Sequence, residues 1–175
     1  MSNSPRSRTD ASLRLIDLLL KGLVRFCHTS AALALVALAG VVLFQIFARY
    51  ALPRSPVWTE ELSRYLFAYA VVLASGAVLI RKRHVNLELF HHRFSPRVQW
   101  SWDLVIHLVI GLFAILLLPH AWAYAANGHR QTSPALGIKL TGVFATTVIF
   151  FGITAAASVL LVARDAIRLI RKERA

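Results

Sequence analysis

Histidine is a residue type whose placement in this sequence could bind a cofactor. His28 and His107 each lie near one end of a long hydrophobic segment, at similar depth. Two facing histidines in a four-helix bundle could ligate a haem iron, so a membrane redox subunit is one possible function. The sequence offers a single pair of this kind, and both residues lie close enough to the ends of their segments to be hydrated. We therefore expect no cofactor and keep haem binding as the alternative.

No catalytic group of residues accompanies these histidines. Asp103, the acid closest to the end of a hydrophobic segment, has no evident partner in the sequence for general acid–base chemistry. The sequence has no glycine-rich phosphate loop and no metal-ligand spacing. Its single cysteine, Cys27, excludes an intrachain disulfide and a cysteine metal cluster. We predict no catalytic residues, no bound metal and no enzymatic activity.

The most informative segment is WTEELSRYLF, residues 58–67. Wound as a helix, it separates an apolar and aromatic face from a charged face. Glu60 precedes Arg64 by four residues, the favourable order for an ion pair on a helix surface. One interpretation is a solvated helix start whose acids suit the helix dipole. The other is a charged docking edge made of Trp58, Glu60, Glu61 and Arg64.

Four hydrophobic segments without Asp, Glu, Lys or Arg must position these residues. A helix needs about 20 apolar residues to cross the hydrocarbon core of a bilayer. The second segment reaches this length by including residues before Arg64, whose long side chain can extend to the interface. We predict an all-α integral membrane protein with four transmembrane helices at approximately 27–50, 60–80, 102–126 and 140–163.

The N-terminal residues precede these spans. Residues 1–10 are polar and rich in Ser and Arg, so we predict a disordered cytoplasmic tail, followed by a single membrane domain of residues 11–175. Within residues 11–23, polar side chains recur at helical spacing among Leu and Ile, which predicts an amphipathic interfacial helix. This helix either lies on the inner leaflet or extends the first span.

The basic residues are distributed unequally along the chain. A net charge of +12 would suggest nucleic-acid binding in a soluble protein. Of the 20 Lys and Arg residues, however, 15 lie in the N-terminal segment, the 81–97 connector and the C-terminal tail. The positive-inside rule therefore predicts that both termini are cytoplasmic, with no nucleic-acid partner. Anionic lipid headgroups are the expected counter-charges, with Arg81, Lys82 and Arg83 as contact residues.

The predicted spans contain little that could form a transport path. No acid or base lies in mid-membrane, and Gln45, the strongest polar residue in any span, lies near an outer end. We therefore expect a component of a larger assembly and not a self-sufficient exporter. Small residues at helix-packing spacing predict contacts within the chain or with a partner: Ala70 with Ala74, and Gly152 with Ala156.

Four motifs are spread over most of the sequence. They are ARY (48–50), WTEELSRY (58–65), HVNLEL (84–89) and TSPALGI (132–138). In these motifs the chain resembles the small membrane subunit, DctQ, of tripartite ATP-independent periplasmic (TRAP) transporters. The family usually has Asp in place of Glu88, and commonly Leu-Pro where this chain has Phe94-Ser95-Pro96. Residues 1–25 lie outside the resemblance.

The resemblance implies a division of labour between three proteins. In this family, a periplasmic binding protein captures the substrate, often a carboxylate-bearing acid, and a large membrane subunit moves it inward with a sodium gradient. The small subunit is a scaffold in the bacterial inner membrane that packs against the large subunit and helps to form the docking surface. This favours the docking interpretation of Glu60, Glu61 and Arg64, since the charge distribution predicts a periplasmic position for them.

Overall fold

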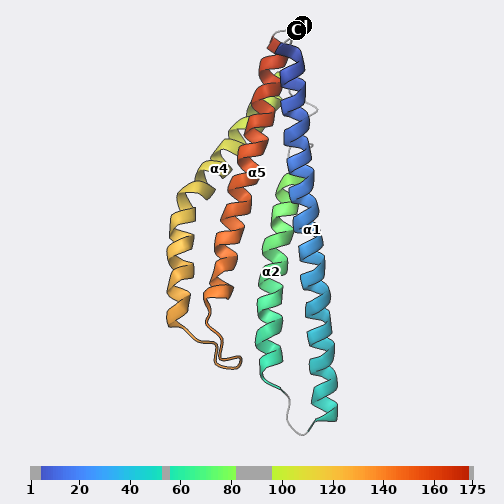
Figure 1. The fold of residues 1–175 in the computed structure, drawn as a ribbon, viewed down its shortest axis with the longest axis vertical. Coiled ribbons are helices and arrows are strands. Elements are labelled where there is room, and N and C mark those ends of the chain that lie inside the picture. The colour runs from blue at the N-terminus through green and yellow to red at the C-terminus, as the bar shows by residue number, and fades with distance from the viewer. Residues whose placement is uncertain (1–4, 53–55, 82–95, 174–175) are drawn as a thin grey trace.

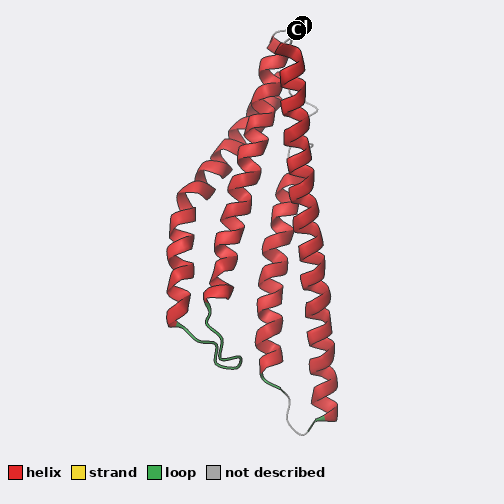
Figure 2. Ribbon diagram, viewed as in Figure 1, coloured by secondary structure: helices red, strands yellow, loops and turns green. Residues whose placement is uncertain are grey.

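Four long helices make up most of the chain. The structure is a computed structural model that describes residues 5–52, 56–81 and 96–173. Each long helix is long and apolar enough to cross a bilayer, which confirms the predicted all-α class with four membrane helices. Figure 2 shows only helices and loops in the described part of the chain. The helices are α1 (Pro5–Ala51), α2 (Trp58–Arg81), α4 (Pro96–Asn127) and α5 (Thr141–Glu173), with a short 3-10 helix η1 (Gly128–Arg130) after α4.

The helices form two pairs. α1 packs along α2, and α4 packs along α5, and these are the most extensive helix–helix contacts. The two pairs meet mainly through α2 and α5, and less extensively through α1 and α5. Both chain ends lie at one end of the bundle, the top of Figure 1, which we name the terminal end. The chain passes from α1 to α2, and from α4 to α5, at the opposite end, which we name the loop end.

α1 is one continuous helix from Pro5 to Ala51. Residues 5–10, predicted to be a disordered tail, therefore lie within a helix in the structure. Proline fits the first turn because its missing N–H would have no helical partner there, and each residue added to an existing helix gains a hydrogen bond. Residues 11–23 extend the first span and do not form a separate helix on the leaflet.

Small side chains fill the contacts between helices. Most of the buried apolar residues are alanine. A Cβ atom added to Gly111 in α4 would lie 2.9 Å from the Cβ atom of Ser158 in α5. A Cβ atom added to Gly76 in α2 would lie 2.5 Å from Cγ2 of Ile153, also in α5. Glycine at these two positions lets the helix backbones approach closely, as expected where lipid provides no hydrophobic drive for association.

Candidate functional site

The carboxylate of Glu61 joins the start of α2 to the loop before α5. Its Oε2 atom accepts a hydrogen bond from the Ser133 hydroxyl and from the backbone N–H groups of Ala135, at 3.0 Å, and Leu136, at 3.1 Å. Its Oε1 atom accepts a hydrogen bond from the Tyr65 hydroxyl, one turn along α2. Convergent N–H groups of a turn are a favourable environment for an anion. Glu61 therefore holds two segments together that are more than 70 residues apart.

The loop that receives Glu61 is itself ordered by backbone hydrogen bonds. The Ser133 N–H donates to the Ile138 carbonyl at 2.8 Å, and the Leu140 N–H donates to the Gln131 carbonyl at 3.0 Å. Gly137, with φ at +67°, allows the left-handed turn between these bonds. The WTEELSRY and TSPALGI motifs thus meet at the loop end, a contact that was not predicted from the sequence.

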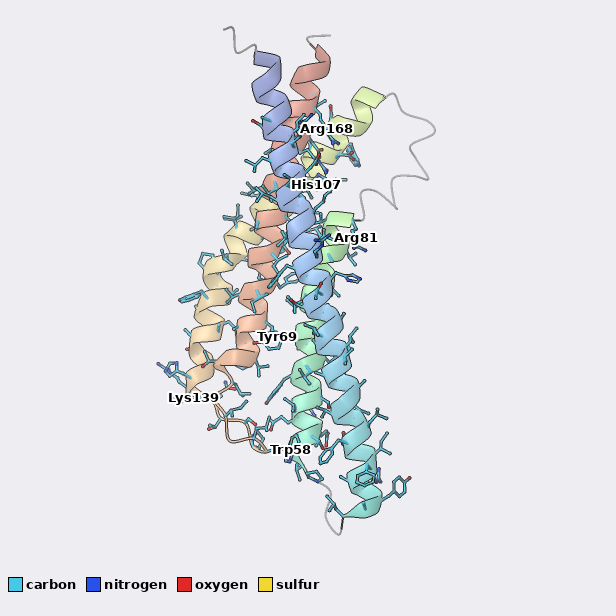
Figure 3. All side chains as sticks on the ribbon, turned by 45° about the vertical axis from the view of Figure 1, so that its right-hand side comes forward. Trp58, Tyr69, Arg81, His107, Lys139 and Arg168 are labelled. Atoms are coloured by element: carbon cyan, nitrogen blue, oxygen red, sulfur yellow. The ribbon has the colours of Figure 1, made fainter. Side chains whose placement is uncertain are left out.

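Glu60 is in a different environment from its neighbour. Its Oε1 atom lies 3.4 Å from Nη2 of Arg64, and the two side chains are 68% and 71% exposed. Trp58 is also exposed and stacks on Phe44 of α1, with 5.9 Å between the ring centroids. Figure 3 shows Trp58 at the loop end of the molecule. We name the exposed surface formed by Trp58, Glu60 and Arg64 the loop-end edge.

A second polar cluster lies at the terminal end and links three helices. Nδ1 of His107 in α4 lies 3.2 Å from Oδ2 of Asp165 in α5. Nε of Arg164 lies 3.4 Å from Oδ1 of the same carboxylate, and Nη1 of Arg164 lies 3.9 Å from Oδ1 of Asp17 in α1. His107, Arg164 and Asp165 are all buried, as is Asp103, one turn before His107. Buried charges are tolerated when they are paired, so this cluster ties α1, α4 and α5 together.

The comparison with known families decides the identity of the chain. Residues 38–171 match the DctQ component of the tripartite ATP-independent periplasmic transporters. This chain belongs to the DctQ family. It is also similar to the sialic acid TRAP transporter small permease protein SiaQ of Vibrio cholerae serotype O1, with 30% identity over 91 residues. That alignment covers 51% of this chain and 53% of SiaQ, so the chain spans about half the length of this relative.

Membership of the DctQ family confirms the resemblance found in the sequence. DctQ proteins are components of transporters and not enzymes. With four helices that can cross a bilayer, this DctQ chain is a multi-pass protein of the inner membrane. The family match covers both motifs that Glu61 joins.

The structure does not support the haem alternative for this DctQ chain. His107 is buried against Asp165, whereas His28 is exposed on α1. α1 packs on α2 and α5, and the main partner of α4 is α5, so the two histidines belong to different helix pairs.

The predicted packing residues of the DctQ chain lie in unlike environments. Ala70 is buried within the chain, with 2% exposure, and Ala74 is partly buried. Ala156 is exposed, and a Cβ atom added to Gly152 would meet no atom within 4 Å. Packing of Gly152 and Ala156 against another subunit therefore stays a prediction.

The predicted lipid contacts fall partly outside the described residues. Arg81 is exposed as the last residue of α2. Lys82 and Arg83 lie outside the part of the chain that the structure describes.

Proposed function

We propose that this chain is the small scaffold subunit of a TRAP transporter. In this proposal it packs against a large membrane subunit and helps to dock a periplasmic substrate-binding protein, for sodium-driven uptake of a carboxylate-type solute. The observation that carries the proposal is the DctQ match over residues 38–171, which includes the last part of α1, all of α2 and α4, and nearly all of α5.

The low burial within the chain supports a scaffold that needs a partner. Within the most apolar part of each membrane helix, between 11% and 28% of residues are buried by the rest of the chain. Large apolar side chains are exposed on all four helices. Such apolar surfaces are stable against lipid or against a second membrane protein. Exposed small residues such as Ala156 would let a helix of a partner subunit approach closely.

The distribution of charge within the bundle supports the proposal that the large membrane subunit, and not this chain, forms the transport path. The buried Asp, Arg and His residues of the described spans are Asp103, His107, Arg164 and Asp165. Figure 3 shows His107 toward the terminal end, and Asp165 and Arg164 lie in the same cluster. They are linked to one another or to other groups of the chain. Ion and proton paths generally use charged groups inside the membrane, and the four hydrophobic segments of this chain contain no Asp, Glu, Lys or Arg.

The charge distribution supports a periplasmic position for the loop-end edge. Both termini lie at the terminal end, which also carries most of the Lys and Arg residues. The positive-inside rule orients the terminal end toward the cytoplasm. In this orientation Trp58, Glu60 and Arg64 face the binding protein, and Glu61 contributes by holding the 131–140 loop beside them.

Co-purification tests the scaffold assignment. A tagged copy of this chain, extracted in mild detergent, should bring a large, many-span membrane protein with it, and its deletion should abolish uptake. Recovery of the chain alone, together with undiminished uptake in the deletion strain, would contradict the proposal.

Reversal of one exposed charge tests the docking surface. Arg64→Glu should raise the binding-protein concentration for half-maximal uptake by roughly three- to tenfold, because charges at a rim mainly alter association. Arg14→Glu, the same substitution at an exposed residue of the terminal end, is the matched control. Both variants should retain the large subunit. An equal effect of both substitutions, or none from Arg64→Glu, would leave the loop-end edge without a docking role.

A further inference from the structure

A cleft of about 730 Å³ opens at the terminal end of the bundle, far from the loop-end edge. Residues of α1, α2 and α5 line it. Its walls combine apolar side chains, Leu20, Val24 and Ile80, with several cations. Figure 3 shows Arg81 at the terminal end of α2, next to α1. The cleft is therefore a mixed apolar and basic site between the first helix pair and α5.

Three exposed cations around this cleft have no acidic partner in the described part of the chain. They are Lys21 and Arg25, one turn apart on α1, and Arg81 on α2. The single acid in the lining, Asp17, lies 3.9 Å from the buried Arg164 and so offsets that residue. Like charges gathered in one cleft repel each other, and a bound anion would relieve this repulsion.

The depth of the cleft matches the headgroup layer of a membrane. The uncharged part of α1, from Phe26 to Ala48, has 23 residues and a length of about 34 Å at 1.5 Å per residue. The hydrocarbon core is about 30 Å thick, so Arg25 lies just outside it. Arg81 likewise follows directly on the buried Ile80 at the end of α2. The cations thus lie at the level of lipid phosphates, with apolar wall residues beside them.

We propose that this cleft binds the headgroup of an anionic phospholipid, of the phosphatidylglycerol or cardiolipin class, from the adjacent leaflet. The guanidinium groups of Arg25 and Arg81 donate to phosphate oxygens, a geometry in which arginine can form two parallel hydrogen bonds. Lys21 adds a third positive charge, and the acyl chains follow the apolar surface toward the bilayer. A free phosphate would use the cations but not the apolar wall, which favours a lipid over a soluble anion.

Native mass spectrometry of the full chain in mild detergent tests this site. Phosphatidylglycerol should form adducts at concentrations where phosphatidylcholine forms none. Arg25→Gln/Arg81→Gln should raise the half-binding lipid concentration roughly tenfold or more, since each basic residue near an anionic surface contributes to attraction. Arg14→Gln/Arg168→Gln is the matched control, because it removes the same charge at the same end and neither residue lines the cleft. Arg14 lies about 16 Å from Arg25 along α1, toward the N-terminus.

Further variants and a competition experiment distinguish lipid binding from binding of other anions and from misfolding of the variants. Arg25→Lys/Arg81→Lys keeps both charges and should restore most of the binding, and circular dichroism should show the same helix content in all variants. Equal adducts with both lipids, or equal losses in both Gln double variants, would overturn a specific headgroup site. So would competition by millimolar inorganic phosphate as effective as added phosphatidylglycerol. A cleft that binds lipid in the isolated chain but not in the complex with the large subunit would belong to the partner interface instead.

Discussion

At the scale of single residues, Glu60 and Glu61 show how far the surroundings of identical side chains can differ. Glu61 accepts hydrogen bonds from Tyr65, Ser133 and two backbone N–H groups of the loop. Glu60 faces solvent with Arg64 beside it. The helical wheel placed both acids on one charged face, because it cannot show which part of the chain comes to lie against that face.

Neutralising these two acids should separate their roles. Glu61→Gln should lower the melting temperature of the purified protein by roughly 3 to 6 °C, since a charged acceptor of several hydrogen bonds is lost. Glu60→Gln should leave the melting temperature nearly unchanged, as for most exposed ion pairs. A scanning fluorescence melt of both variants in detergent measures this. Equal melting temperatures for the two would show that Glu61 does not hold the loop.

The contact between His107 and Asp165 is a second feature of single residues that should contribute to stability. His107→Leu removes one partner of a buried carboxylate and should lower the free energy of unfolding by about 3 kcal/mol. His28→Leu, at an exposed position of α1, should change it by less than about 0.5 kcal/mol. In a chain that already carries His107→Leu, Asp165→Asn should lower the free energy of unfolding by less than it does in the unsubstituted chain. Denaturation in mixed micelles gives these values, and strictly additive effects would contradict a direct pairing.

At the scale of helices, close approach of backbones fixes the contacts of α5. Ser158 lies against Gly111 of α4, and Ile153 lies against Gly76 of α2. The first contact holds α5 to α4 within their pair, and the second joins that pair to α2 of the other. By contrast, Gly152 leaves open space, although it lies next to Ile153 in the sequence.

Alanine at these glycines should therefore have position-dependent effects. Gly111→Ala should destabilise the protein by about 1 to 3 kcal/mol, because the new methyl group would overlap Ser158 unless the helices shift. Gly152→Ala should be neutral or slightly stabilising, since alanine is the better helix former and no atom opposes it. Unfolding of the isolated chain in mixed micelles would compare the two. A destabilised Gly152→Ala chain would show a contact of α5 that the structure lacks.

The helices themselves were largely predictable from the sequence. Uncharged stretches of about 20 residues indicate membrane spans, whichever helices pack beside them. The predicted spans lie within the four membrane-length helices apart from residue 140, but the helices continue beyond the predicted limits, most of all before residue 27. The start of α1 was not predicted, because residues 5–10 are polar and continue a helix that is already formed. The loop-end contact of Glu61 and the His107–Asp165 pair could not be predicted either. Both depend on how helices distant in the sequence are aligned, which hydropathy does not encode.

At the scale of the whole molecule, the two chain ends share one end of the bundle. An even number of membrane spans places both chain ends on the same side of the membrane. The charge distribution predicts that this side is the cytoplasm. Cys27 is fully buried, so it should not react with a membrane-impermeant thiol reagent. The natural chain therefore provides a silent background for labelling.

Cysteine labelling of intact spheroplasts should define the orientation of the chain in the membrane. Gln131→Cys, exposed at the loop end, should react with an impermeant maleimide in intact spheroplasts. Ala11→Cys, exposed near the start of α1, should react only after lysis. The reverse pattern would place the loop end in the cytoplasm, where it could not meet a periplasmic binding protein. Labelling of both from outside would contradict four spans.

The arrangement of the helices as two pairs has a consequence for how the protein is made. Because α1 and α2 pack mainly on each other, the first half of the chain can complete its own contacts while the ribosome is still synthesising the second. Glu61 is then already in place, but the Ser133 hydroxyl that it binds is 72 residues later in the sequence. We therefore expect that hydrogen bond to form only when the second pair of helices docks on the first.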